Sequence, residues 1–233
     1  WIVGGANGVT LNAPKGSTVV GDVLYVADID YLRSFDAVTG DPIDSLNFPG
    51  ATFLNDVTSD RQGNVYVSDI GFTTVPSFGP SGTDAVYKVS PDGEVTVLAA
   101  GNDVLHHPNG LAALPGGRVQ VVTFDPFDGT SELFTLDHKG RTRDVVTLPT
   151  GLLDGVVALS GGRTLVSSWV DFSNATAGVI YLVEANGDIV EVAGGFQNAS
   201  DIGYDATRNR VLVPELPDPG TGGRVVIRTL PVR

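Results

Sequence analysis

The sequence predicts an all-β fold of the propeller type, built from a repeated unit of short strands. An apolar strand recurs five times, in the segments 13–20, 54–60, 108–114, 153–159 and 200–206, and a turn and a second apolar strand follow each copy. These second strands are expected at 23–29, 64–70, 118–124, 164–170 and 210–216. If Gly16, Asp56, Gly110, Gly155 and Ile202 are equivalent, the steps between copies are 40, 54, 45 and 47 residues. Steps of this size are typical of propeller blades, which pack around a common axis.

The second repeat shows the whole unit. We expect its inner strand at 57–60, its second strand at 65–69, a loop at 71–84, a third strand at 85–90 and a fourth at 94–99. Val65 and Val67 alternate with Tyr66 and Ser68, the period of two that strands between neighbouring sheets require. Pairs of Asp-Gly at 92–93 and Asn-Gly at 186–187 indicate hairpins.

The two ends of the chain leave the closure of the ring open. The last repeat offers strands at 202–204, 210–213 and 224–230, and the leading segment 1–4 is interpreted as an unpaired outer strand. Either residues 1–4 complete a ring of five blades, or they end a first blade that is largely absent from a six-bladed ring. Periodicity alone does not choose between the two closures.

Composition narrows the class of protein. The repeat runs through all 233 residues without a linker, which favours one domain over 1–233, and 42% hydrophobic residues suffice for a core. The net charge of −13 and the lack of a basic run argue against nucleic acid and anionic membranes as partners. The chain has no Cys, which excludes disulfides and thiolate chemistry, and no Met, with Trp1 first. We therefore expect that an N-terminal piece has been removed, which slightly favours a secreted or periplasmic monomer.

Five polar residues stand directly before the predicted inner strands: Lys15, Asn55, Asn109, Asp154 and Asp201. Because inner strands line the channel of a propeller, these side chains should converge there, and their carboxylate and amide oxygens suit Ca²⁺ or Mg²⁺. Two carboxylates ~4 Å apart repel by roughly 4 kcal/mol at an effective dielectric constant of 20. Asp154 and Asp201 would therefore need a cation, a shared proton or the charge of Lys15. The alternative is that these residues cap the strands through Asx-type turns.

At these residues the sequence resembles the gluconolactonase and regucalcin family of six-bladed propellers, and more distantly paraoxonases and strictosidine synthase. The resemblance rests on Pro108-Asn109-Gly110, on Asp154-Gly155 and on Asn55-Asp56, in this order along the chain. It implies a divalent cation, calcium above all, held by Asn109 and Asp154, with Asn55 contacting the substrate or a water molecule. The family's glutamate ligand has no counterpart here, since its place would lie upstream of Trp1.

The resemblance also implies the chemistry, which is the hydrolysis of a small-molecule lactone or ester. A metal would polarise the carbonyl group, and Asp154 or Asp201 would activate water as a base. Substrate contacts are expected from Lys15, Asn55, His107 and Trp169, although His107 is also consistent with a solvated loop and Trp169 with packing between blades. The alternative function is a non-catalytic propeller that binds a protein or small ligand through the loops on this face.

Overall fold

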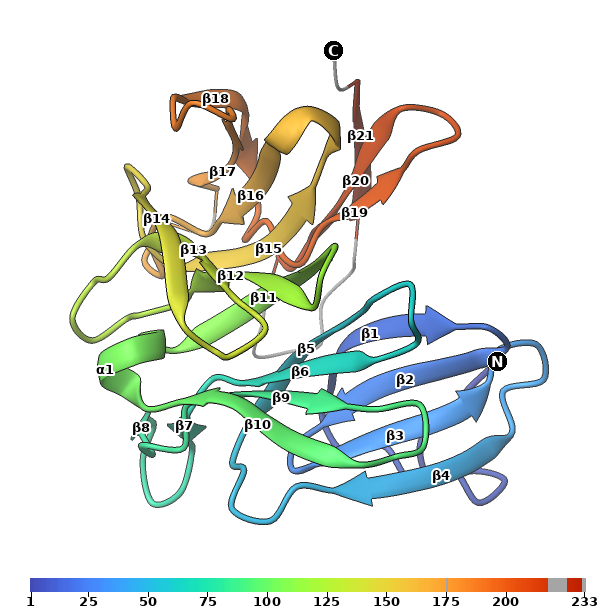
Figure 1. Cartoon of the computed structure of the whole chain (residues 1–233). Helices are drawn as coiled ribbons and strands as arrows, with labels where there is room; N and C mark the ends of the chain where they lie inside the picture. The colour runs from blue at the N-terminus through green and yellow to red at the C-terminus, as the bar shows by residue number, and fades with distance from the viewer. Residues whose placement is uncertain (175, 218–225, 232–233) are drawn as a thin grey trace.

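The computed structural model describes residues 1–174, 176–217 and 226–231, and in these ranges it consists almost entirely of antiparallel sheets joined by loops and turns (Figure 1). The first blade contains β1 (Pro14–Val20), β2 (Val23–Asp28), β3 (Tyr31–Asp36) and β4 (Pro42–Asn47). The second contains β5 (Leu54–Ser59), β6 (Val65–Asp69), β9 (Ala85–Val89) and β10 (Val95–Ala100), and its long loop carries the hairpin β7 (Phe72–Thr73) and β8 (Gly79–Pro80). This agrees with the strand order expected for this repeat.

The third blade contains β11 (Pro108–Leu114), β12 (Arg118–Thr123), β13 (Glu132–Leu136) and β14 (Thr142–Thr147). The fourth contains β15 (Leu153–Ala158), β16 (Thr164–Ser168), β17 (Gly178–Val183) and β18 (Ile189–Phe196), and the fifth contains β19 (Gly203–Asp205), β20 (Arg210–Glu215) and β21 (Val226–Pro231). Two residues of the strand expected at 224–230, namely 224 and 225, lie outside the described residues. Helix is confined here to α1 (Asn102–Leu105) and the 3-10 turn Ser160–Gly162. The predicted all-β propeller fold is thus confirmed.

Alternating side chains of each blade fill two different hydrophobic cores. In β6, Val65 and Val67 pack toward the first blade with Leu54, whereas Tyr66 packs toward the third blade with Phe134. The same alternation builds the cores between the third and fourth blades and between the fourth and fifth blades. Each blade is therefore stabilised by its neighbours, as the repeat requires.

The inner strands pack in chain order around the channel: β1 on β5, β5 on β11, β11 on β15 and β15 on β19. Among the described strands, β19 and β1 do not pack against each other in this way. Thr18 Oγ1 lies 3.1 Å from Ser59 Oγ, and the Ala113 amide donates to Thr58 Oγ1 at 3.3 Å. Neighbouring inner strands therefore run in the same direction, and all of them begin at the same face of the ring.

The leading segment does not form the outer strand that the sequence suggested. Residues 1–4 have no strand conformation; instead Ile2 packs with Val9 and Leu11 on Val26 and Phe35 of the first blade. This packing covers a sheet face that would otherwise be exposed, so apolar burial rather than strand pairing explains the apolar start. No helix in the described part of the chain has the length and apolar character needed to cross a membrane.

Candidate active site at the mouth of the channel

A β-bulge near the start of each inner strand builds the polar part of the site. In β15, Leu153 pairs with Ser168 and Val156 with Val166, so one extra residue is accommodated between these pairs. β1, β5 and β11 have the same irregularity at the same place. A bulge re-aims side chains, and here two consecutive residues of each inner strand come to the channel.

The ladder assigns these residues to two layers. The first layer, nearest the mouth, contains Lys15, Asn55, Asn109 and Asp154, and the second contains Gly16, Asp56, Gly110 and Gly155. In the fifth blade Ala199 pairs with Glu215 and Gly203 with Leu212, which places Ser200 in the first layer and Asp201 in the second. The equivalence of Ile202 with the glycines is therefore wrong by one residue. Asp201 lies one layer deeper than the sequence suggested, and Ser200 occupies its expected place.

Glycine in the second layer lets neighbouring inner strands approach each other closely. A Cβ atom on Gly110 would lie 2.2 Å from the Asp154 carbonyl oxygen, and one on Gly155 would lie 2.3 Å from the Ile202 nitrogen. Such contacts are far inside van der Waals distance, so a side chain there would push two blades apart. The glycines of the Pro-Asn-Gly and Asp-Gly segments thus have a packing role.

Two buried serines join consecutive blades beside the second layer. Ser68 Oγ accepts from the Asp56 amide at 2.9 Å and donates to the Asn109 carbonyl at 2.8 Å. Ser167 Oγ accepts from the Gly155 amide at 2.7 Å and donates to the carbonyl of Ser200 at 2.8 Å. Each hydroxyl accepts a hydrogen bond from an amide that the bulge leaves without a partner in the adjacent strand. It also donates to a carbonyl of the next blade's inner strand and so holds that strand in place.

Asp154 is the buried carboxyl group of the first layer. Its Oδ2 accepts from Trp169 Nε1 at 2.7 Å and from Ser200 Oγ at 3.4 Å. Burial raises the pKa of Asp154 to about 7, and the charge of Asp56 adds to the rise, while the bond from Trp169 acts in the opposite direction. A carboxyl group with this pKa exchanges a proton near neutral pH.

Two amides accompany this carboxyl group. Asn109 is buried and its Nδ2 donates to the Leu153 carbonyl at 3.3 Å, which leaves Oδ1 as its accepting atom. Asn55 is partly exposed in the first layer. Within the described residues, no other group hydrogen-bonds to Asn55's side chain, to Asn109 Oδ1 or to Asp154 Oδ1. The structure therefore brings Asn109 and Asp154 to adjacent inner strands with oxygen atoms to spare.

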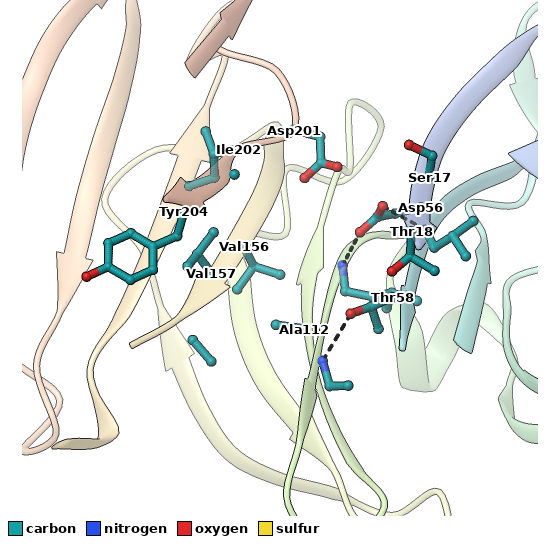
Figure 2. Close-up of a pocket in the computed structure, with 15 residues that line it drawn as sticks. Ser17, Thr18, Asp56, Thr58, Ala112, Val156, Val157, Asp201, Ile202 and Tyr204 are labelled. Atoms are coloured by element: carbon teal, nitrogen blue, oxygen red, sulfur yellow. Dashed lines mark hydrogen bonds between the residues drawn. The ribbon is translucent and has the colours of Figure 1, made fainter. Parts of the chain in front are cut away.

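Asp56 and Asp201 form a carboxyl pair in the second layer and face each other across the channel (Figure 2). Asp56 accepts from the amides of Val57 and Leu111 at 2.6 and 2.7 Å. Burial raises the pKa of both groups, and for Asp201 the charges of Asp56 and Asp154 raise it further. Because both carboxyl groups are buried and lie close to each other, a proton shared within the pair is favoured over two negative charges.

Below the carboxyl pair the channel widens into a cavity of about 310 Å³, lined by Ser17, Thr18, Asp56, Thr58, Asp201 and Tyr204 among others (Figure 2). Its lining residues follow the bulges along the inner strands, so the cavity lies on the opposite side of the pair from Asp154. The pair thus separates the mouth from the cavity.

Lys15 does not act as the counter-charge of the channel carboxylates. Its Nζ lies 5.2 Å from the centre of the Phe53 ring, a cation–π geometry. Although the residue is exposed, partial burial of its ammonium group lowers the pKa of Lys15, and the carboxylate that opposes this shift is Asp28. Lys15 therefore stands at the edge of the mouth.

His107 is buried, so the interpretation as a solvated loop is wrong. Its Nδ1 lies 3.0 Å from Asp84 Oδ1 and 2.9 Å from the Ile70 carbonyl oxygen, and its amide donates to Asp84 Oδ1 at 2.9 Å. Burial lowers the pKa of His107, but the bonds to Asp84 and Ile70 outweigh burial and raise it. Asp84, 23 residues away, is the partner that the sequence did not reveal. Together they anchor the strand that carries Asn109.

An aromatic cluster surrounds the first layer. Trp169, which binds Asp154, packs in an apolar core with Phe72 and Phe124, and this core also contains Ile70 and Leu152. Trp169 thus packs between blades, and its Nε1 also binds the Asp154 carboxyl group, while its contact with a substrate stays a prediction.

The acidic residues that follow the second strands are structural. Asp28 accepts from the amides of Asn12 and Ala13, Asp69 accepts from those of Thr52, Phe53 and Gly71, and Glu215 accepts from that of Gln197. Each one satisfies the backbone of the loop that leads into its own blade's inner strand. These carboxylates therefore shape the mouth without facing it.

The side-chain oxygen atoms at the mouth suit a hard divalent cation but fill only part of its coordination shell. Calcium takes six to eight oxygen ligands, and Asn55, Asn109 and Asp154 offer three side chains with unbonded oxygen atoms. Among the described residues, no group of three or more His, Cys, Asp or Glu side chains is placed to hold a metal ion. Carbonyls, water or substrate would have to complete the shell.

Comparison with known proteins places the fold. No protein-family model matches the sequence, and a search of curated proteins finds no significant match to it in sequence. A gluconolactonase of Xanthomonas campestris is similar in structure, with a TM-score of 0.67, 21% identity, and coverage of 89% of this chain and 71% of that one. A luciferin-regenerating enzyme has a TM-score of 0.61 and 14% identity, with coverage of 93% of this chain and 76% of that one. The hydrazine synthase of Kuenenia stuttgartiensis has a TM-score of 0.62 and 14% identity, with coverage of 86% of this chain and 61% of that one. The resemblance to gluconolactonase-like propellers is confirmed at the level of the fold.

Proposed function

We propose that the chain is a hydrolase of lactones or related carboxylic esters, with its reaction centre at Asp154 and Asn109. The observation that carries the proposal is a buried carboxyl group with a pKa of about 7 at the base of an aromatic mouth. A general base works best when its pKa lies near the working pH. The shared fold with a gluconolactonase supports the reaction class, although folds of this kind also host other chemistry.

In this proposal, Asp154 accepts a proton from the attacking water. Trp169 holds Oδ2 by its Nε1 hydrogen bond and so fixes the orientation of the carboxylate toward that water. The oxygen of that water bonds to the carbonyl carbon of the ester. The bond from this carbon to the ring oxygen then breaks, and the released alkoxide takes the proton held by Asp154 to give the hydroxy acid, which restores the carboxylate. Asp201, hydrogen-bonded to Asp56 one layer deeper, does not contact the substrate but keeps a proton close to Asp154.

We assign Asn109 and Asp154 as the protein ligands of a divalent cation, calcium by the resemblance, with Asn55 on the substrate side. When bound, such an ion would supply positive charge that polarises the carbonyl group and stabilises the oxyanion. It would also lower the pKa of Asp154, because an adjacent positive charge favours the carboxylate. The spare oxygen atoms of both side chains support this assignment.

The test compares lactone hydrolysis by the wild type and by Asp154→Asn, followed by titration of the released acid. Loss of a general base typically costs ~10²–10⁴ in rate, so we expect at least a hundredfold drop. Asp92→Asn, in an exposed hairpin turn, is the matched control and should keep full activity. Calorimetric titration with CaCl₂ should give saturable binding that Asn109→Ala weakens. Full activity of Asp154→Asn would refute the proposal.

A non-catalytic binding propeller is the second candidate. It is favoured by the position of Lys15, which stands over Phe53 in the first layer and adds no oxygen ligand. A folded wild type that binds ligand at the mouth but hydrolyses no lactone or ester would decide for this function.

A further inference from the structure

Three exposed aromatic rings gather at the mouth. Among the Phe and Trp side chains of the described residues, four are exposed: Trp1, Phe78, Phe127 and Phe172. Phe78 follows β7 in the second blade, Phe127 lies between β12 and β13, and Phe172 lies between β16 and β17. Loops of three different blades therefore bring exposed rings to one face of the ring of blades.

These rings continue the buried cluster without interruption. The Phe72 ring lies 5.1 Å from that of Phe78 and 5.5 Å from that of Phe127, centre to centre. The Phe172 ring lies 5.8 Å from that of Trp169, whose Nε1 binds Asp154. The rings of Phe72 and Phe124 join the two groups at 6.4 Å. An apolar surface thus leads from solvent to the proposed base.

Core packing does not account for the outer rings. Phe78 and Phe172 are 53% and 55% exposed, so each leaves about half of its surface in water, and exposed apolar area is unfavourable by roughly 25 cal/mol per Å². Adjacent exposed rings above a buried polar group are typical of a ligand-binding pocket.

The charges of the mouth restrict the ligand further. Asp154 is acidic, the His107 ring is paired with Asp84, Lys15 stands at the edge over Phe53, and the chain carries a net charge of −13. An anionic ligand would be repelled. A polyhydroxylated ligand would lose hydrogen bonds to water against rings that offer none in return.

On the basis of the proposed hydrolase function, we infer that the mouth selects an uncharged lactone or ester with an aromatic or bulky apolar substituent. The outer rings of Phe78, Phe127 and Phe172 would receive this substituent, and the ester group would lie beside Asp154. Sugar lactones would be poor substrates for the same reason.

The test uses γ-butyrolactone, γ-phenyl-γ-butyrolactone and glucono-δ-lactone with the wild type, the double variant Phe78→Ala/Phe127→Ala, and Trp1→Ala. Trp1 is 71% exposed and its Nε1 bonds to the Val38 carbonyl in the first blade, so its variant controls for loss of an exposed ring elsewhere. We expect the wild type to prefer the phenyl lactone by about tenfold or more in kcat/KM. The double variant should lose this preference, whereas Trp1→Ala should keep both the preference and the wild-type rate with γ-butyrolactone.

A second measurement separates this inference from the reaction itself. Calorimetry with 5-phenyl-2-pyrrolidinone, a lactam that resists hydrolysis, should show binding that the double variant weakens about tenfold and Trp1→Ala leaves unchanged. Such binding without hydrolysis of any lactone would refute the proposed function and support the aromatic mouth. A preference for glucono-δ-lactone, or equal lactam binding by the wild type and the double variant, would overturn the inference.

Discussion

Relative to the wild type, Asp154→Asn should be more stable at alkaline pH than it is at acidic pH. The substitution keeps the size of the side chain and an oxygen acceptor for Trp169 Nε1, but it removes the charge that burial disfavours. Because the site lacks a paired basic group among the described residues, ionisation of Asp154 is unfavourable in the folded protein. The comparison therefore isolates the burial of one negative charge.

The magnitude follows from the pKa of the group. The carboxyl group of Asp154 moves from an ordinary value of 3.8 to about 7, and about three pH units at 1.36 kcal/mol each give about 4 kcal/mol. Between these pH values the folded state binds more protons than the unfolded state. The free energy of unfolding of the wild type therefore falls as pH rises from 4 to 7, and Asp154→Asn lacks this contribution.

Urea unfolding at pH 4 and pH 8 without calcium measures the effect. The difference in unfolding free energy, variant minus wild type, should increase by about 4 kcal/mol from pH 4 to pH 8. Asp137→Asn is the control: burial acts against it, but the bonds from Arg141 lower the pKa of Asp137, so this carboxyl group stays ionised in the folded protein at both pH values and its difference should remain nearly constant. A constant difference for Asp154→Asn, or a variant that loses stability toward pH 8, would refute the reasoning.

Three further substitutions test the way in which the blades are joined. Ser167→Ala should lower the free energy of unfolding in urea by about 2–3 kcal/mol, because it leaves the Gly155 amide and the Ser200 carbonyl unpaired. Ser173→Ala, in an exposed loop, should have little effect. Equal losses for the two variants would contradict the role of Ser167. Gly110→Ala should cost more than about 3 kcal/mol, since its Cβ would meet the Asp154 carbonyl oxygen; Gly79→Ala, where no atom lies within 4 Å, is the control, and a stable Gly110→Ala would disprove the close approach. His107→Gln should lower thermal stability by about 3 kcal/mol, because Asp84 would lose its buried partner; an unchanged melting temperature would show that the pair contributes nothing.

The repeat made the architecture predictable, while the exact register of one blade was not. Four inner strands carry Gly or Asp in the second layer, directly after the residue of the first layer. In the fifth blade the sequence Ser200-Asp201-Ile202-Gly203 offers an aspartate in either layer. Only the pairing of Ala199 with Glu215 fixes the choice, and that pairing depends on where the bulge lies.

The surroundings of the site depended on contacts that periodicity does not encode. The loops that carry Phe78, Phe127 and Phe172 differ in length and follow no repeat, so their convergence is visible only once the blades are assembled. The same holds for Asp84, whose loop position gave no sign that it meets His107. Local pattern predicts strands because it reflects burial along one element, whereas these pairs are set by tertiary packing.

The bulge at the start of each inner strand gives the protein two independent tiers of chemistry. Because the first residue of the pair faces the mouth and the second faces the neighbouring blade or the deeper cavity, selection can alter the mouth one blade at a time while the supporting layer stays fixed. Changing the substrate of such a scaffold should therefore begin with positions 15, 55 and 200, and leave the proposed reaction centre at 109 and 154 and the second layer at 16, 56, 110, 155 and 201 untouched.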